Sequence, residues 1–239
     1  MKWNIDINCD LGEGAENDEK IMPLINSCNI ACGGHYGTDA TIEKAVTLAK
    51  KYGVKIGAHP SFPDPINFGR AVMEIDAEAL KKSIIEQVQK FQKIATQVGV
   101  PMNHVKLHGA LYNQAAKSIN VAETVIEALL QIGTDYAIYT PHNSALEAIG
   151  QAHFEIIPEV FIDRTYQTDG SLTPRSQENA MIIDPVKAWD QIKNCHLNNK
   201  VETITNKSIP LKGKTYCIHG DAAHCLKILY YIKDQLPHA

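Results

Sequence analysis

The sequence predicts an α/β fold: a single-domain (β/α) barrel of about seven parallel strands that spans residues 1–239. Short apolar runs alternate with longer amphipathic segments along the whole chain, and parallel strands need crossover helices of this kind. The length also fits, because single α/β barrels commonly take ~250 residues and shortened ones ~200. No linker divides the chain. Seven or eight such units favour a closed barrel over the alternative, an open doubly wound sheet.

Seven runs have the length and apolar content of buried strands. They are residues 3–10, 28–34, 54–59, 103–108, 136–142, 156–163 and 215–221. Four segments between or after them have helical periodicity, with polar residues suited to capping at their starts and glycine at most of their ends. They are residues 38–53, 76–99, 118–133 and 221–236. Two long loops rich in Pro, Gly and Asp, 60–70 and 164–180, are candidate lids over a site.

One strand sets three titratable side chains against two apolar ones. His104, Lys106 and His108 alternate with Val105 and Leu107, and successive side chains of a strand point to opposite faces. An ordinary half-buried strand would send the polar face to water. In a (β/α) barrel the outer face packs against helices, so we expect the polar face to line the lumen. The same parity groups Asn4, Asp6, Asn8 and Asp10 in the first strand, Glu159, Phe161 and Asp163 in the sixth, and Cys217, His219 and Asp221 in the seventh.

Titratable residues also gather at the carboxyl ends of the predicted strands, where barrel active sites lie. One histidine at a strand end is usually structural, but six His or Asp residues at one rim indicate an enzyme. They are Asp10, His59, His108, Asp163, His219 and Asp221, with His35 following Gly33-Gly34 after the second strand. His104 and His142 are equally open to either interpretation, whereas His153, His196 and His238 lie in predicted helices or tails.

Composition excludes several function classes. A net charge of −4 and a pI near 6.2 leave no basic stripe for nucleic acid or an anionic membrane. No apolar run approaches the ~20 residues of a membrane span, and the start of the chain lacks the apolar core of a signal peptide. We therefore expect a cytoplasmic protein. The six cysteines form no C-x-x-C pair, which favours reduced structural thiols over disulfides or a zinc knuckle.

Two chemistries suit this rim. Asp10, His35 and His59 are candidate ligands of a divalent metal such as Zn, Mn or Fe, although their spacing matches no compact metal motif. Without metal, the same groups can act as general acid and base, with Lys106 stabilising developing negative charge. Gly-Lys-Thr at 213–215 is not a P-loop, because position 208 is Ser and the segment precedes a strand.

Six ordered segments resemble the LamB/YcsF family, which includes the A subunit of bacterial 5-oxoprolinase. They are DINCDLGEG, NIACGGHYG, IGAHPSFPD…FGR, HVKLHGALYN, DRTYQTDGSLTPR and CIHGD, and they span residues 4 to 221. The resemblance implies a distorted TIM-like barrel related to the glycoside hydrolase/deacetylase folds. It also implies an enzyme that hydrolyses a cyclic amide: the lactam of 5-oxo-L-proline is opened to L-glutamate with consumption of ATP. The resemblance further implies two partners, 5-oxoprolinase subunits B and C.

Matching these segments position by position implies a set of site residues. The carboxylates and histidines would activate water and move protons, and the arginines would hold the substrate carboxylate or a phosphate. The matched residues are Asp10, Glu13, His35, His59, Asp64, Arg70, Lys106, His108, Asp163, Arg164, Arg175, His219 and Asp221. Three places depart from the frequent family pattern, at CGGHYGT, FGRA and HPSFPD, and they bear on substrate detail more than on the class of reaction.

Two rival functions remain open. The first is a stand-alone metal-dependent carbohydrate deacetylase or amidohydrolase, which predicts a bound divalent ion and activity without ATP or partners. The second is a non-catalytic regulatory subunit that binds a small ligand. The density of acids and bases at the rim argues against the second.

Overall fold

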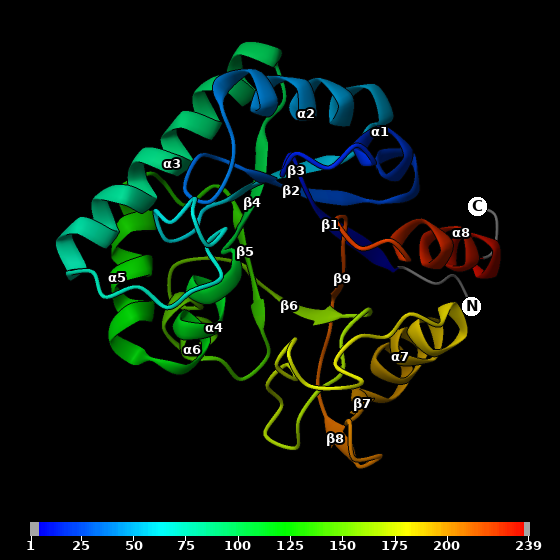
Figure 1. Ribbon diagram of the computed structural model, residues 1–239. Coiled ribbons are helices and arrows are strands. Elements are labelled where there is room, and N and C mark those ends of the chain that lie inside the picture. Colours follow the sequence, from blue (N-terminus) through cyan, green and yellow to red (C-terminus); the bar gives the residue numbers. More distant parts are fainter. Residues whose placement is uncertain (1–4, 237–239) are drawn as a thin grey trace.

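Seven parallel strands form a closed barrel inside a ring of helices (Figure 1). The computed structural model describes residues 5–236. The barrel strands are β1 (Asp6–Leu11), β2 (Ser27–Ala31), β3 (Lys55–His59), β4 (Met102–Lys106), β5 (Ala137–Pro141), β6 (Ile156–Phe161) and β9 (Thr215–His219). The predicted barrel is thus confirmed, with strands that mostly end earlier than predicted. Trp3 and Asn4, with which the first predicted strand began, lie outside the described residues, as does His238.

Strand β9, close to the C-terminal end of the chain, closes the barrel. It pairs with β1 on one side, where His219 lies beside Asp10, and with β6 on the other, where Thr215 lies beside Glu159. The remaining strands pair in sequence order from β1 to β6. This topology brings the first and last strands together, so that residues about 200 positions apart share one rim.

Three of the four predicted helices begin where the sequence signals them, and two of these end at the predicted glycine; the third ends at Leu130, before Gly133. The helix α2 (Asp39–Tyr52) starts with a reciprocal Thr38–Thr41 capping box and ends at Gly53, whose φ is 68°. Asp76 caps α3 (Ala77–Val98) and Ser118 caps α5 (Ile119–Leu130). The other helices are α1 (Asp18–Ile21), the 3₁₀ turn η1 (Met22–Leu24), α4 (Gly109–Lys117), α6 (Ala145–Gly150), α7 (Pro185–Asn198) and α8 (Cys225–Gln235).

The last helix starts at Cys225, not at Asp221 as predicted. The chain leaves β9 close to β1: a Cβ on Gly220 would lie 2.8 Å from the Asp10 carbonyl oxygen. Residues 220–224 form turns and a bend, and the helix begins after them.

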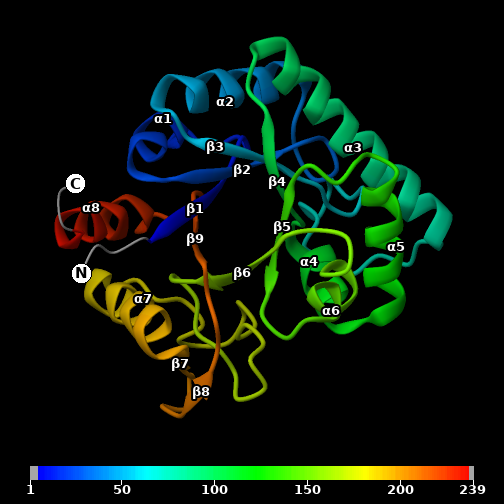
Figure 2. The same ribbon diagram turned by 180° about the vertical axis from the view of Figure 1, so that it is seen from behind.

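A two-stranded antiparallel ribbon, β7 (Lys200–Glu202) and β8 (Ser208–Pro210), lies outside the barrel below α7 (Figure 2). Strands of three residues are too short to show a period in the sequence. A bridge from Tyr166 to Thr203 ties the ribbon to the loop 164–180. This loop is therefore fixed at its base.

The apolar faces of the strands point outward, as predicted. Ile30, Val105 and Ile218 are fully buried in the hydrophobic core shared with the helices. All six cysteines are free and buried, in agreement with the expected structural thiols. In the described part of the chain, no helix has both the length and the apolar character that crossing a bilayer requires.

Candidate active site

The barrel lumen holds a buried ion-pair network centred on Lys106. Its Nζ lies 2.9 Å from Asp10 Oδ1, 3.0 Å from Glu159 Oε1 and 2.9 Å from Cys217 Sγ. The amide of Asn8 donates to Glu159, and Tyr112 Oη donates to the second oxygen of the same carboxylate at 2.8 Å. A buried charge is tolerated when it is paired and hydrogen-bonded. The polar face of β4 thus lines the lumen, as its alternation predicted.

This network fixes the charges of its members. Burial opposes ionisation of both Asp10 and Lys106, but the surrounding charges together outweigh it: Lys106 and His59 for Asp10, and Asp10 and Glu159 for Lys106. As a result, the pKa of Asp10 lies well below its usual range and the pKa of Lys106 well above. Burial raises the pKa of the Cys217 thiol, so this group stays protonated beside the ammonium.

His104 lies on β4 two residues before Lys106, and its ring fills the space beside Gly57, which has no side chain. Its Nε2 lies 2.7 Å from Asn29 Oδ1, and its ring stacks on Tyr139 at 3.9 Å between centroids. A Cβ on Gly57 would lie 2.3 Å from the His104 ring. Burial, followed by the charge of Lys106, holds the pKa of His104 well below its usual value. His104 is therefore a neutral structural residue of the lumen.

A carboxylate–imidazole pair stands at the rim between β6 and β9. His219 Nδ1 lies 2.8 Å from Asp163 Oδ2, and the His219 backbone N–H donates to the same oxygen at 3.1 Å. Asp163 is fully buried, and burial disfavours its charge, but His219 lowers its pKa overall. Because Asp163 holds Nδ1, the other ring nitrogen of His219 is left for proton transfer.

Four further groups converge beside Asp10. Glu13, His35, His59 and His108 each offer one ligand atom, and these atoms lie within 4.8 Å of one another. Asp10 Oδ2 is 3.5 Å from His59 Nε2, while its Oδ1 accepts from Asn29 and Lys106. The predicted metal set of Asp10, His35 and His59 is thus adjacent in space, but Glu13 and His108 complete the tight cluster.

The arginines surround the opening. Arg164 is buried, and its Nη2 donates to the Thr173 carbonyl, whereas its Nε has no hydrogen-bond partner among the described residues. Arg70 pairs with Asp221 at 2.9 Å, and both side chains are about two-fifths exposed (42% and 37%). Arg175 is exposed on the loop 164–180.

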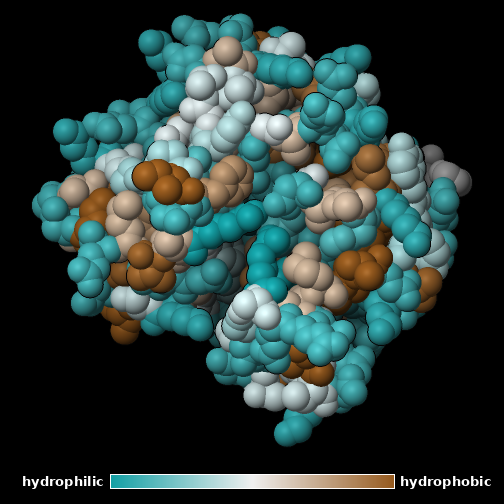
Figure 3. Space-filling view, in the orientation of Figure 1, coloured by the Kyte–Doolittle hydropathy of each residue, from teal (hydrophilic) through white to brown (hydrophobic). Residues whose placement is uncertain are grey.

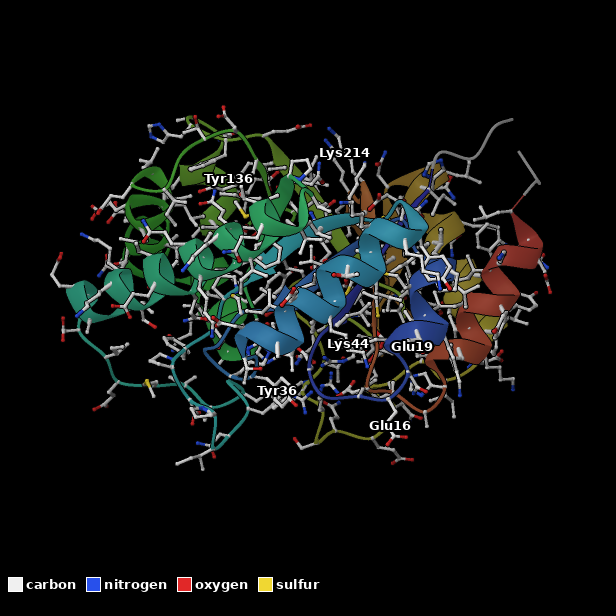
Figure 4. All side chains as sticks on the ribbon, turned by 90° about the horizontal axis from the view of Figure 1, so that it is seen from above. Glu16, Glu19, Tyr36, Lys44, Tyr136 and Lys214 are labelled. Atoms are coloured by element: carbon white, nitrogen blue, oxygen red, sulfur yellow. The ribbon has the colours of Figure 1, made fainter. Side chains whose placement is uncertain are left out.

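A cavity of about 520 Å³ opens between these groups at the carboxyl ends of the strands. In the space-filling view, hydrophilic side chains surround a hollow near the centre of this face (Figure 3). Figure 4 views the molecule from above, with Tyr36 and Glu16 on the side of this face and Tyr136 and Lys214 at the opposite end of the barrel. A second cavity, of about 580 Å³, lies at that opposite end and includes Tyr136 and Lys214. The acid–base groups described above line the first cavity, which is our candidate site.

Most of the predicted site residues meet at this cavity. Those that line it are Asp10, Glu13, His59, Arg70, Lys106, His108, Arg164, Arg175 and His219. Asp163 lies behind His219 and His35 behind Glu13. Asp221 is at the rim with Arg70, and Asp64 instead accepts from Asn67 within the loop 60–70. His142 lies apart, beside Glu147.

Sequence reasoning missed several lumen residues. Asn29 is the one polar side chain in the apolar run 28–31, and the parity rule applied there would have found it. Tyr112 lies on α4, and no pattern in the sequence sets it apart from a core aromatic residue. Glu159 was placed on the inner face but not among the site residues.

A model of the LamB/YcsF family matches residues 5–239. The chain belongs to the LamB/YcsF family. Among its relatives, a Brevibacillus brevis protein named as the A subunit of 5-oxoprolinase is 42% identical over 238 residues, which cover 97% of this chain and 94% of that protein. A protein of the same name from Tolumonas auensis is 39% identical, again over 97% of this chain and 95% of the relative.

Solved structures agree with this assignment. The lactam utilization protein from Thermus thermophilus superimposes on this LamB/YcsF chain with a TM-score of 0.89 at 31% identity, over 98% of this chain and 97% of that one. A protein from Enterococcus faecalis has a TM-score of 0.56 at 11% identity, over 98% and 95%, and shares only the fold.

Proposed function

We propose that this chain is the A subunit of a 5-oxoprolinase, which opens the lactam ring of 5-oxo-L-proline to give L-glutamate. The observation that carries the proposal is the cavity at the barrel mouth, where the Asp163–His219 pair, the Asp10–Lys106 pair and three arginines meet. This set of groups suits hydrolysis of a small, anionic amide. The names of the relatives identify which amide to test.

The reaction needs an energy source, because an unstrained five-membered lactam is a poor electrophile. In our proposal, ATP transfers its terminal phosphoryl group to the lactam carbonyl oxygen and leaves as ADP. Water attacks the activated ring carbon, and the C–N bond breaks to leave the free amine and an acyl phosphate. A second water hydrolyses the acyl phosphate to the glutamate side-chain carboxylate and phosphate. The sum is 5-oxoproline, ATP and two waters giving glutamate, ADP and phosphate. We propose that 5-oxoprolinase subunits B and C take part in this ATP-consuming step and that the assembly works in the cytoplasm.

The residues divide these tasks by charge. His219, oriented by Asp163, takes the proton from the attacking water. Lys106 keeps its proton and stabilises negative charge on the reacting oxygen atoms. Arg164 and Arg175, with Arg70 at the rim, hold the substrate carboxylate or the phosphate, since a guanidinium binds such groups through two hydrogen bonds. Asp10 keeps Lys106 in place through the 2.9 Å contact.

The test is glutamate formation from 5-oxoproline by this chain co-purified with subunits B and C, with and without ATP. We expect glutamate only with ATP and all three chains. We expect Asp10→Asn to lower turnover about 10²- to 10⁴-fold, because Lys106 loses one of its two carboxylate partners and the contact that holds its Nζ in place. Asp39→Asn is the matched control, because this carboxylate is exposed on α2 and pairs with Lys90 outside the cavity.

Two results would contradict the proposal. Glutamate formed by this chain alone without ATP would favour a stand-alone amidohydrolase. No glutamate from the folded, assembled complex would remove 5-oxoproline as the substrate, and amide and acetylated-sugar panels would follow.

A further inference from the structure

We propose that Glu13, His35, His59 and His108 bind one divalent transition-metal ion, for which Zn²⁺ is the best match. The inference does not depend on the substrate or on ATP. It rests on the spacing and chemistry of four side chains that the fold brings together from the ends of β1, β2, β3 and β4.

The hydrogen bonds behind two rings fix which nitrogen atoms carry protons. His59 Nδ1 lies 2.8 Å from the Lys106 carbonyl oxygen, and His108 Nε2 lies 3.0 Å from the Phe68 carbonyl oxygen. A carbonyl oxygen only accepts, so both of these nitrogens carry N–H. In the neutral rings, His59 Nε2 and His108 Nδ1 are therefore both lone pairs, and they face each other at 3.0 Å. Two lone pairs at this distance repel each other, so a proton or a metal ion must lie between or beside them.

A carboxylate adds a third acceptor to the same point. Glu13 Oε1 lies 3.3 Å from His108 Nδ1, 3.7 Å from His59 Nε2 and 3.0 Å from His35 Nε2. Asp10 extends the negative field, since its Oδ2 is 3.5 Å from His59 Nε2. The field at this point therefore favours positive charge.

The donor separations agree with a metal site. A tetrahedral ion with bonds of about 2.0–2.1 Å sets neighbouring donors about 3.3–3.4 Å apart. Four donor pairs in the cluster are separated by 3.0, 3.0, 3.3 and 3.7 Å. All four ligand atoms lie within 4.8 Å of one another, so binding an ion would draw the wider pairs together.

The chemistry of the donors narrows the choice of ion. Three imidazoles and one carboxylate suit Zn²⁺ and its transition-metal neighbours, whereas Mg²⁺ and Ca²⁺ prefer all-oxygen sites. The carbonyls behind His59 and His108 are the outer hydrogen-bond acceptors that metal-bound histidines usually have. Because Glu13, His59 and His108 also line the cavity, an ion held here would be reached from it.

The surrounding backbone is built to hold these rings. Phe68 takes a left-handed conformation (φ 55°), which directs its carbonyl at His108, and a Cβ on Gly69 would come within 3.0 Å of both His108 and His35. His35 stacks on His108 with ring centroids 3.7 Å apart and ring planes 5° apart, so the His35 ring must turn before both rings can direct a nitrogen at one ion. The loop 60–70 is thus a fixed wall of the cluster, fastened by the bond from Ala110 N to the Gly69 carbonyl.

The experiment uses the untagged full-length chain, stripped with a chelator and titrated with Zn²⁺ by calorimetry and with Co²⁺ by visible absorption. We expect one ion per chain and no heat with Mg²⁺. Glu13→Gln and His108→Asn should each weaken Zn²⁺ binding by more than the roughly 10- to 100-fold that loss of an outer partner costs. His142→Asn, a histidine beside Glu147 outside the cavity, should bind as the parent chain does.

The outcomes separate this proposal from its competitors. Asp10→Asn should keep one ion per chain; loss of the ion there, with retention in Glu13→Gln, would overturn the ligand set. No stoichiometric binding by the folded parent chain would overturn the site, and a proton shared by His59 and His108 would then explain their contact. If His108→Asn does not fold, Glu13→Gln decides, because Glu13 is the least buried of the four ligands. None of these results depends on whether glutamate is formed.

Discussion

At the scale of single residues, Lys106 shows why the lumen is polar. Its side chain is among the largest fully buried ones, and it offsets two carboxylates, Asp10 and Glu159, that the strands also direct inward. Removal of Lys106 would leave both carboxylates buried without their cation, which costs more than the network itself contributes. Lys106 is therefore the residue on which this network depends.

We predict that Lys106→Met lowers the free energy of unfolding by about 3–5 kcal/mol, because two buried carboxylates lose their cation. Urea unfolding followed by circular dichroism measures this. The matched substitution is Lys44→Met on α2: Lys44 is largely exposed, 3.8 Å from Glu19 (Figure 4), and its loss should cost within about 1 kcal/mol. Equal effects of the two substitutions would show that the lumen network is not essential for stability.

At the scale of elements, the strands were the most predictable part of the molecule. The alternation in β4 identified both the strand and the side that faces the lumen. The face on which a side chain lies does not change when a strand starts or ends a residue or two from the predicted position. The ends themselves were not predictable. His108 reads as the last residue of a strand, but it is the N-cap position of α4, because Gly109 adopts φ 55° and turns the chain there.

Strand β3 supplies a prediction of its own. Gly57→Ala would place a Cβ 2.3 Å from the His104 ring, and we expect the free energy of unfolding to fall by about 1–3 kcal/mol. In a His104→Ala background the same change should cost much less, because the ring it would strike is gone. A double-mutant cycle with urea unfolding measures the difference. Additive effects would mean that Gly57 is required for another reason.

At the scale of the whole molecule, the sequence predicted which residues share one end of the barrel, but not how their side chains are paired there. Barrel topology indicated that Asp10, His59, Lys106 and His219 share one end, because all barrel strands are parallel. It did not indicate that Asp163 turns to His219 or that Glu13 turns to the histidines. Such partners depend on loop paths and on side-chain rotation, which a period in the sequence does not record.

The buried histidines predict how the whole fold responds to acid. Burial lowers the pKa of His35, His104 and His108, and for His108 the neighbouring His59 adds to this. Below about pH 6.5, the ordinary pKa of histidine, these residues bind protons in the unfolded chain but stay neutral in the folded one. The free energy of unfolding must therefore fall as the pH falls. Each ring contributes a loss of up to about 1.4 kcal/mol per pH unit between about pH 6.5 and its folded pKa.

Urea unfolding of the chelator-treated chain at several pH values from about 7 to about 5 tests this response. His59 does not cancel this loss of stability below about pH 6.5. Its pKa is raised in the folded chain, so its contribution to the free energy of unfolding changes only above that pH. His104→Asn should be less stable at neutral pH but should show a shallower slope. A flat profile for the parent chain would contradict the assignment of neutral buried rings.

The pairing of β9 with both β1 and β6 has a consequence for how the protein is made. A ribosome adding about 5–20 residues per second needs on the order of 10–40 s to pass from Asp6 to Thr215. Until β9 is made, any sheet formed by β1 to β6 has two open edges, which can pair with other chains. The strand synthesised last removes both edges in one event, and the same event delivers His219 to Asp163. A chain that stops short of β9 therefore has neither a closed sheet nor its acid–base pair.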